Sequence, residues 1–150
     1  MIALIQRVAG AQVTVDGEVV GAIDRGLVAL VAAVEGDGPD QARRLAERVA
    51  GYRVFPDEAG RMNCSSADLG CEVLAVPQFT LAADTRKGMR PSFKPAAQAD
   101  AGERLFEAFV AALRELLGGA VATGAFGADM QVQLTNDGPV TFWLEAPPAG

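Results

Sequence analysis

The stretch Thr135-Asn136-Asp137-Gly138-Pro139-Val140-Thr141-Phe142-Trp143-Leu144 places a Gly-Pro step between two segments with strand character. Residues 131–134 alternate polar and apolar side chains, and residues 140–144 are β-branched and aromatic; both patterns are typical of strands. Because proline lacks an N–H and glycine adopts backbone shapes that other residues cannot, the step either makes a turn or presents bare main chain to another group. Within this segment alone, the Asn-Asp-Gly-Pro chemistry favours a hairpin turn.

The length and composition indicate one folded domain over residues 1–150. Half of the residues are hydrophobic and 21% are charged, which excludes a disordered chain. The segment 1–7 is too short and too soon interrupted by polar residues for a signal peptide, and the apolar run 27–34 is too short to span a bilayer. We therefore expect a soluble, cytoplasmic protein that has no membrane partner.

The chain has two cysteines and no histidine. A zinc site at Cys64 and Cys71 would need two carboxylate ligands as well, so we expect no metal and no cofactor. A cytoplasmic location disfavours a disulfide, and Cys71 is expected to be a small core residue. Without histidine there is no Ser-His-Asp triad, Cys-His pair or imidazole base. An enzyme of this sequence must use a reactive substrate, carboxylates, or positioned backbone groups together with the substrate's own atoms.

The net charge of −6 argues against broad, non-specific binding to nucleic acids, including DNA. Positive charge is nevertheless concentrated in residues 84–94, which contain both lysines of the chain. This basic loop is either a solvated loop or a contact for a few phosphate groups. The candidate phosphate contacts are Arg86, Lys87, Arg90 and Lys94.

Hydrophobic periodicity predicts an α/β fold with a single domain, in which mixed β-sheets carry helices packed on one face. One helix is expected to begin at Pro39 with Asp37 as its N-cap, and a second to cover about 99–117 and end at Gly118. A hairpin is expected at Asp16-Gly17. The expected strands are 2–8, 11–15, 18–23, 27–31, 72–76 and the two flanks of the Gly-Pro step.

The segment Pro77-Gln78-Phe79-Thr80-Leu81 follows the predicted strand 72–76 directly. In α/β proteins, the carboxyl end of a strand beside a loop is a common place for a site. Thr80 offers a hydroxyl, and the N–H groups of Gln78, Phe79 and Thr80 are candidates to point into a shared pocket. The alternative is that Phe79 and Leu81 are core residues and Thr80 only satisfies a loop carbonyl.

Together with the rest of the chain, these segments resemble the D-aminoacyl-tRNA deacylase family. Several long motifs in one order make this resemblance specific. The family has serine in a Ser-Gln-Phe-Thr motif where this chain has Pro77, which removes a hydroxyl and an N–H. We expect Pro77 and Met130 to form a retuned pocket edge. The matching pieces are residues 1–8, 13–15, 51–55, 78–84, 88–93, 124–132 and 136–142.

The resemblance implies a deacylase-like fold in β/β/α layers and an activity in chiral proofreading during translation. The implied reaction is hydrolysis of the ester that joins a D-amino acid, or glycine mischarged on tRNA-Ala, to the 3′ end of tRNA. The implied assembly is a homodimer with its active sites at the interface. The implied catalytic segment is Gln78, Phe79 and Thr80, whose N–H groups would stabilise the oxyanion while the ribose 2′-OH helps to organise attack.

The resemblance also implies a cis Gly138–Pro139 peptide that serves as the chirality gate. Carbonyls of these two residues would press against the substrate Cα and leave no room for an L side chain. Arg7 either braces this element by hydrogen-bonding its carbonyls or is a surface cation. Thr80 is either the nucleophile or, as we favour because no base is evident, a positioning residue. Two alternatives to the deacylase are a non-catalytic dimer that binds free D-amino acids and a hydrolase of small esters that uses Thr80.

Overall fold

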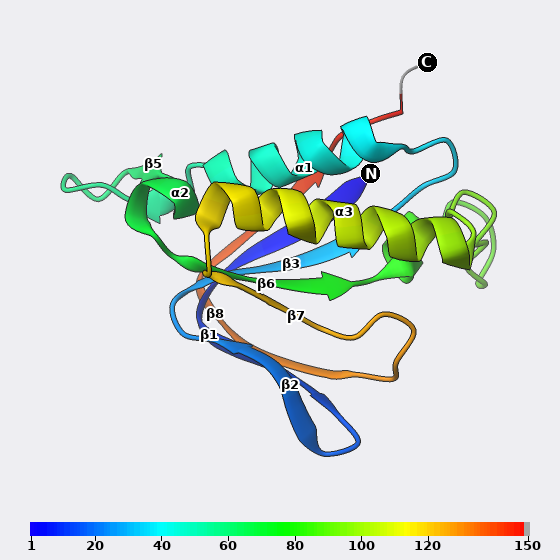
Figure 1. The fold of residues 1–150 in the computed structure, drawn as a ribbon, viewed down its shortest axis with the longest axis horizontal. Coiled ribbons are helices and arrows are strands. Elements are labelled where there is room, and N and C mark those ends of the chain that lie inside the picture. The colour runs from blue at the N-terminus through cyan, green and yellow to red at the C-terminus, as the bar shows by residue number, and fades with distance from the viewer. Residues whose placement is uncertain (149–150) are drawn as a thin grey trace.

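The computed structural model describes residues 1–148 of the chain (Figure 1). Its strands and helices alternate in a single α/β domain. None of the helices within these residues is long and apolar enough to cross a membrane. In chain order the elements are β1 (Ile2–Val15), β2 (Glu18–Ile23), β3 (Gly26–Ala32), α1 (Pro39–Gly51), β4 (Phe55–Pro56), β5 (Met62–Cys64), α2 (Ser66–Leu69), β6 (Glu72–Pro77), the 3₁₀-helix η1 (Phe79–Ala82), α3 (Ala99–Leu117), β7 (Val121–Thr123) and β8 (Gln131–Glu145).

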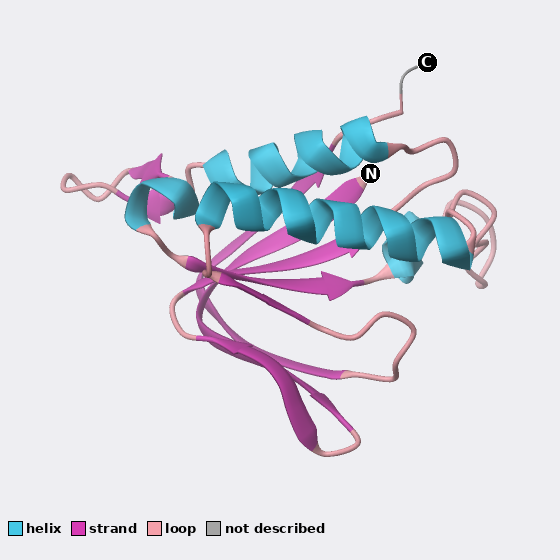
Figure 2. Ribbon diagram, viewed as in Figure 1, coloured by secondary structure: helices cyan, strands magenta, loops and turns pink. Residues whose placement is uncertain are grey.

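The main sheet is mixed, as the sequence predicts. Its strand order is β2-β1-β3-β6-β7, and β8 also pairs with β1. β1 is antiparallel to its three neighbours, whereas β3, β6 and β7 are parallel to one another. Helices α1 and α3 lie side by side over one face of this sheet (Figure 2). The carboxyl ends of the three parallel strands therefore meet at one edge of the sheet.

Two hydrophobic clusters hold these layers together. The larger one lies between the sheet and the helices, with Phe109 and Leu113 of α3 and Leu45 of α1 fully buried in it. The smaller one fills the other face, where the sheet curls so that the β1–β2 hairpin lies beneath it (Figure 1). A Cβ atom on Gly21 of β2 would collide with the Thr123 carbonyl of β7, so this close approach requires glycine. The two β layers thus belong to one curled sheet.

Some local features of the structure differ from the predictions made from sequence. The segments 2–8 and 11–15 form one continuous strand, and the short helix α2 was not predicted. The N-cap of α1 is Gly38 rather than Asp37. The carboxylate of Asp37 instead accepts hydrogen bonds from the Val34 N–H at 2.7 Å and from the Met1 amino group at 2.9 Å.

The hairpin expected at Gly138-Pro139 is wrong, because β8 runs through this step and pairs with β1 on both sides of it. Asn136 lies opposite Val8, and Thr141 lies opposite Gln6. Residues 137–140, which we call the Gly-Pro bulge, therefore face a single β1 position, that of Arg7. The Gly138–Pro139 peptide is cis, as expected. A Cβ atom on Gly138 would lie 2.6 Å from the Val140 nitrogen, so only glycine fits there.

Candidate active site

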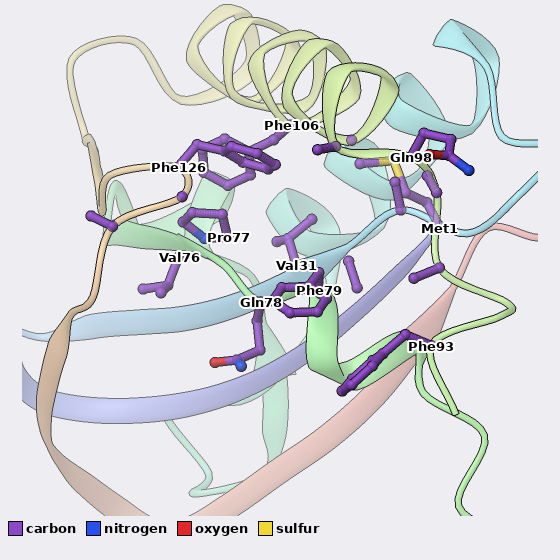
Figure 3. A pocket seen from close by; sticks show the side chains of 18 of the residues that line it. Met1, Val31, Val76, Pro77, Gln78, Phe79, Phe93, Gln98, Phe106 and Phe126 are labelled. Carbon is purple, nitrogen blue, oxygen red and sulfur yellow. The ribbon is translucent and has the colours of Figure 1, made fainter. Parts of the chain in front are cut away.

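A cavity of about 590 Å³ lies at the carboxyl ends of β3, β6 and β7 (Figure 3). One wall comes from the ends of β3 and β6, including Val31 and residues 76–79. The opposite wall comes from the first turns of α3 and from residues 126–130, in the loop between β7 and β8. The position agrees with the rule that α/β sheets place their sites at the carboxyl ends of parallel strands.

The cavity brings together some of the residues predicted from the sequence and leaves others apart. Pro77, Gln78, Phe79 and Met130 all line it. Thr80 is exposed and does not line the cavity, although it directly follows Phe79. Residues 7, 138 and 139 do not line the cavity of their own subunit. One subunit therefore does not place the proposed chirality gate against the proposed catalytic segment.

The first turn of η1 presents free N–H groups beside the cavity. The N–H of Gln78 donates to the Val31 carbonyl at 2.8 Å, so the expectation that it points into the pocket is wrong. Within the described residues, the N–H groups of Phe79 and Thr80 have no hydrogen-bond acceptor. Unpaired donors of this kind are usual at the start of a helix, where they can bind water or a ligand. Two donors, rather than three, are available.

The Thr80 hydroxyl is held by its neighbour. It accepts a hydrogen bond from the Gln78 side-chain amide at 2.5 Å, which leaves its own proton free to be donated. No hydrogen bond joins it to an ionisable side chain of residues 1–148. The geometry suits a group that positions an ester or a water better than it suits a nucleophile, which would need a base.

Of the aromatic residues that line the cavity, Phe93, Phe106 and Phe126 were not predicted as site residues. The ring centroids of Phe126 and Phe106 are 6.5 Å apart, and those of Phe79 and Phe93 are 5.3 Å apart (Figure 3). Phe106 lies within the predicted helix 99–117, and the three-residue strand β7, which leads to Phe126, was not among the predicted strands. The combination is an apolar cleft with few polar groups, as in many small-molecule sites.

Pro77 ends the pairing of β6 with β7 at the edge of the cavity. Along this parallel ladder the Val73 N–H donates to the Ala120 carbonyl, and the Gly124 N–H donates to the Ala75 carbonyl. The next rung would need an N–H at position 77, which proline lacks. β7 ends at Thr123, and the chain beyond it leads into the cavity wall. Pro77 is therefore at the edge of the pocket, as expected.

Arg7 contacts the Gly-Pro bulge, but not at the atoms expected. Its Nε donates to the Asp137 carbonyl at 2.9 Å and its Nη1 to the Val54 carbonyl at 2.7 Å. The side chain is only 14% exposed, so it is not a surface cation. Gly138 and Pro139 are exposed and have no partner on β1. The arginine thus anchors one end of the bulge and leaves the Gly-Pro step itself uncovered.

The basic loop is closed by paired main-chain hydrogen bonds between Asp84 and Ser92, at 2.8 and 3.0 Å. Arg86 donates from its side chain to both Asp84 carboxylate oxygens at 2.9 Å. These bonds, with one from the Arg86 main-chain N–H, lower the pKa of Asp84 to about 2. Among the residues described, no ion pair engages Lys87, Arg90 or Lys94, which are exposed. These three cations are free to bind phosphate groups.

A carboxyl titration tests this pairing. The Asp84 carboxyl carbon should titrate by NMR with a midpoint of about 2, and Arg86→Ala should move the midpoint back toward 3.8. Because the folded-state pKa is lowered, the contact stabilises the loop fully above the ordinary pKa and is lost as the pH falls through the folded value. Lys87→Ala should leave the midpoint unchanged. An unshifted midpoint in Arg86→Ala would show that the guanidinium does not hold Asp84.

No group of three or more His, Cys, Asp or Glu side chains arranged to hold a metal ion was found in the described part of the chain. Both cysteines are free, and Cys71 is buried as expected.

Comparison with known proteins gives a consistent result. A family model described as D-Tyr-tRNA(Tyr) deacylase matches residues 4–145. A curated protein of Halorhodospira halophila, named D-aminoacyl-tRNA deacylase, is 73% identical over 148 residues, which cover 99% of this chain and 96% of that protein. A protein of Alkalilimnicola ehrlichii with the same name is 62% identical over 149 residues, which cover 99% of each chain.

Solved structures share the whole fold. One titled "c-Myc DNA Unwinding Element Binding Protein" has a TM-score of 0.94 and 38% identity, covering 98% of this chain and 99% of the other. A second, titled as a probable eukaryotic D-amino acid tRNA deacylase, has a TM-score of 0.85 over 97% of this chain and 98% of its own. At 17% identity, this second likeness concerns the fold alone.

Proposed function

The chain belongs to the D-aminoacyl-tRNA deacylase family of ester hydrolases, and we propose that it removes D-amino acids, and glycine mischarged on tRNA-Ala, from the 3′ end of tRNA in the cytoplasm. The observation that supports this proposal best is the pair of free N–H groups of Phe79 and Thr80 beside an apolar cavity. The chain has no histidine, so the reaction must depend on such main-chain groups.

The cavity takes the terminal adenosine of the tRNA. Its volume of about 590 Å³ lies in the range of small-molecule pockets. Phe126 and Phe106 offer aromatic surface to a purine, and the rim formed by Gln78 and Phe79 lies where the ribose and its ester would emerge. This placement brings the ester carbonyl next to η1.

The chemistry then needs little from side chains, because an aminoacyl ester is already activated. Water attacks the carbonyl carbon, and the oxyanion forms on the N–H groups of Phe79 and Thr80, each worth about 3–4 kcal/mol in such a role. The intermediate collapses as the ribose 3′-oxygen leaves and takes up the proton that the attacking water has lost, and the free amino acid and the tRNA are released. Thr80 positions the water or the ester, and the neighbouring 2′-OH helps to organise attack.

Chirality is read across a dimer. Gly138 and Pro139 are exposed on their own subunit and do not line its cavity, which supports a role for them at the cavity of a second copy. Phe142 and Trp143, which follow the bulge on β8, are 37% and 48% exposed and provide apolar surface for that copy. The two carbonyls then bind the substrate amino group and exclude an L side chain, while a D side chain points away.

The activity is tested with three tRNA substrates. D-Tyr-tRNA should be hydrolysed. L-Tyr-tRNA should react at least about a hundredfold more slowly, because its side chain is excluded by shape. D-Tyr-tRNA that ends in 2′-deoxyadenosine should be hydrolysed more slowly than D-Tyr-tRNA with the 2′-OH. The readout is kcat/KM for release of tyrosine. Binding of D-tyrosine with no turnover would favour the amino-acid-binding dimer. If a small D-tyrosine ester and the 2′-deoxy substrate were both hydrolysed as fast as D-Tyr-tRNA, the result would favour the small-ester hydrolase.

Arg7→Ala tests whether this side chain braces the gate. Loss of its bond to the Asp137 carbonyl should lower the D/L ratio of kcat/KM by about tenfold, the effect expected of one charge-assisted hydrogen bond. Arg48→Ala is a matched control, because Arg48 donates to the Glu145 carbonyl at the far end of the same strand, at 2.7 Å. Undiminished discrimination in folded Arg7→Ala would remove the brace from the proposal.

Lys87→Ala and Lys94→Ala test the basic loop as a contact for the acceptor-stem backbone. Each should weaken binding similarly for all tRNAs and reduce the slope of log Kd against log salt by about one. Arg44→Ala, which removes an exposed cation from α1, is the control and should leave the slope as it is. Slopes equal to that of the unaltered protein in both lysine variants would place the tRNA elsewhere.

A further inference from the structure

The side chain of Asn136, the last β8 residue before the Gly-Pro bulge, reaches across the bulge to its far end. Its Oδ1 accepts from the Val140 N–H at 2.8 Å, and its Nδ2 donates to the Val140 carbonyl at 3.2 Å. The same Nδ2 lies 3.0 Å from the Thr141 hydroxyl. One side-chain amide thus pairs with both main-chain polar groups of residue 140.

These bonds replace the rung that β1 does not supply. Residues 137–140 have no register partner on β1, and Val140 is only 6% exposed. A buried N–H without an acceptor is costly, so the Val140 amide needs the Asn136 oxygen. The bulge is therefore fixed at both ends, by Arg7 at the Asp137 carbonyl and by Asn136 at Val140. Gly138 and Pro139 lie between these two points.

We propose that Asn136 is a positioning residue that sets the stereochemical selectivity of the deacylase by fixing where the Gly138 and Pro139 carbonyls lie. This inference rests on the proposed function of these carbonyls. Steric exclusion fails if the excluding carbonyls can move away from the substrate. The contacts that hold these carbonyls therefore matter more for rejecting the L substrate than for the reaction of the D substrate. Asn136 itself does not line the cavity.

The chemistry of the amide predicts an order among variants. Asparagine supplies an acceptor and two donors on one short side chain. Aspartate at this position keeps the acceptor for the Val140 N–H but loses the donor to the Val140 carbonyl and Thr141. Alanine loses both. Selectivity should therefore fall in the order Asn, Asp, Ala.

The test compares Asn136→Ala, Asn136→Asp and a matched control, with steady-state kinetics on D- and L-Tyr-tRNA. The control is Gln133→Ala, which removes a side-chain hydrogen bond of 2.7 Å to Gln12 in the same strand pair but leaves the bulge alone. In Asn136→Ala the D/L ratio of kcat/KM should fall by about tenfold, as for the loss of one or two hydrogen bonds. KM for the D substrate should rise while its kcat stays within about threefold. The control should keep the ratio.

A second readout is independent of activity. Hydrogen exchange of the Val140 amide should be faster in Asn136→Ala and close to unaltered in Asn136→Asp, since only the second keeps the acceptor. If Asn136→Ala does not fold, the D/L ratio of kcat/KM is measured in Asn136→Asp and Thr141→Val instead. Each of these variants removes at least one hydrogen bond that Asn136 Nδ2 donates.

Suppose that folded variants lose activity equally on both substrates, so that the D/L ratio of kcat/KM is unchanged. That result would overturn the role of Asn136. The proposed function would still stand, provided that the unaltered protein discriminates between D- and L-Tyr-tRNA. An unaltered protein with no preference for the D substrate would overturn both.

Discussion

The pairing of β8 with β1 on both sides of the Gly-Pro bulge is the constraint on which the rest of the molecule depends. Asn136 opposite Val8 and Thr141 opposite Gln6 fix where the bulge begins and ends. The same half of β1 also pairs with β3, whose carboxyl end borders the cavity. The bulge is consequently held in a fixed place on the same sheet that borders the cavity. A gate that must exclude one enantiomer needs this rigidity.

The proposed site uses main-chain N–H and carbonyl groups where many hydrolases use side chains. In the proposed mechanism, the two free N–H groups at the start of η1 stabilise the oxyanion, and no imidazole takes part because the chain has no histidine. The substrate supplies the rest, since its ester is activated and carries a neighbouring hydroxyl. In the same proposal, the exposed cations of the basic loop give a protein of net charge −6 a local attraction for a polyanion. A small set of fixed dipoles and a shaped cleft are sufficient for the proposed reaction.

The sequence predicted what depends on local pattern. The bounds of α3 agree with the predicted 99–117 because its apolar stripe is long, and the segment after β6 was recognised from a buried strand followed by a loop. It could not predict what depends on distant partners. The turn chemistry at Gly138 is the same in a hairpin and in a bulge, and only pairing with β1 distinguishes them. The hydrogen bond from the Gln78 N–H to the Val31 carbonyl likewise follows from tertiary contacts. So does the arrangement of Phe79, Phe93 and Phe126 around one cavity.

The central claim is that main-chain carbonyls of one subunit read the chirality of a substrate held by another. It is tested most directly by a crystal structure of the protein with an amide-linked D-tyrosyl adenosine, which cannot be hydrolysed as the ester is. The account predicts adenosine in the cavity, the acyl oxygen on the Phe79 and Thr80 N–H groups, and the α-amino group within about 3.2 Å of the Gly138 or Pro139 carbonyl of the second copy. An amino group bound only by other groups, with residues 138 and 139 facing solvent in every subunit, would contradict it.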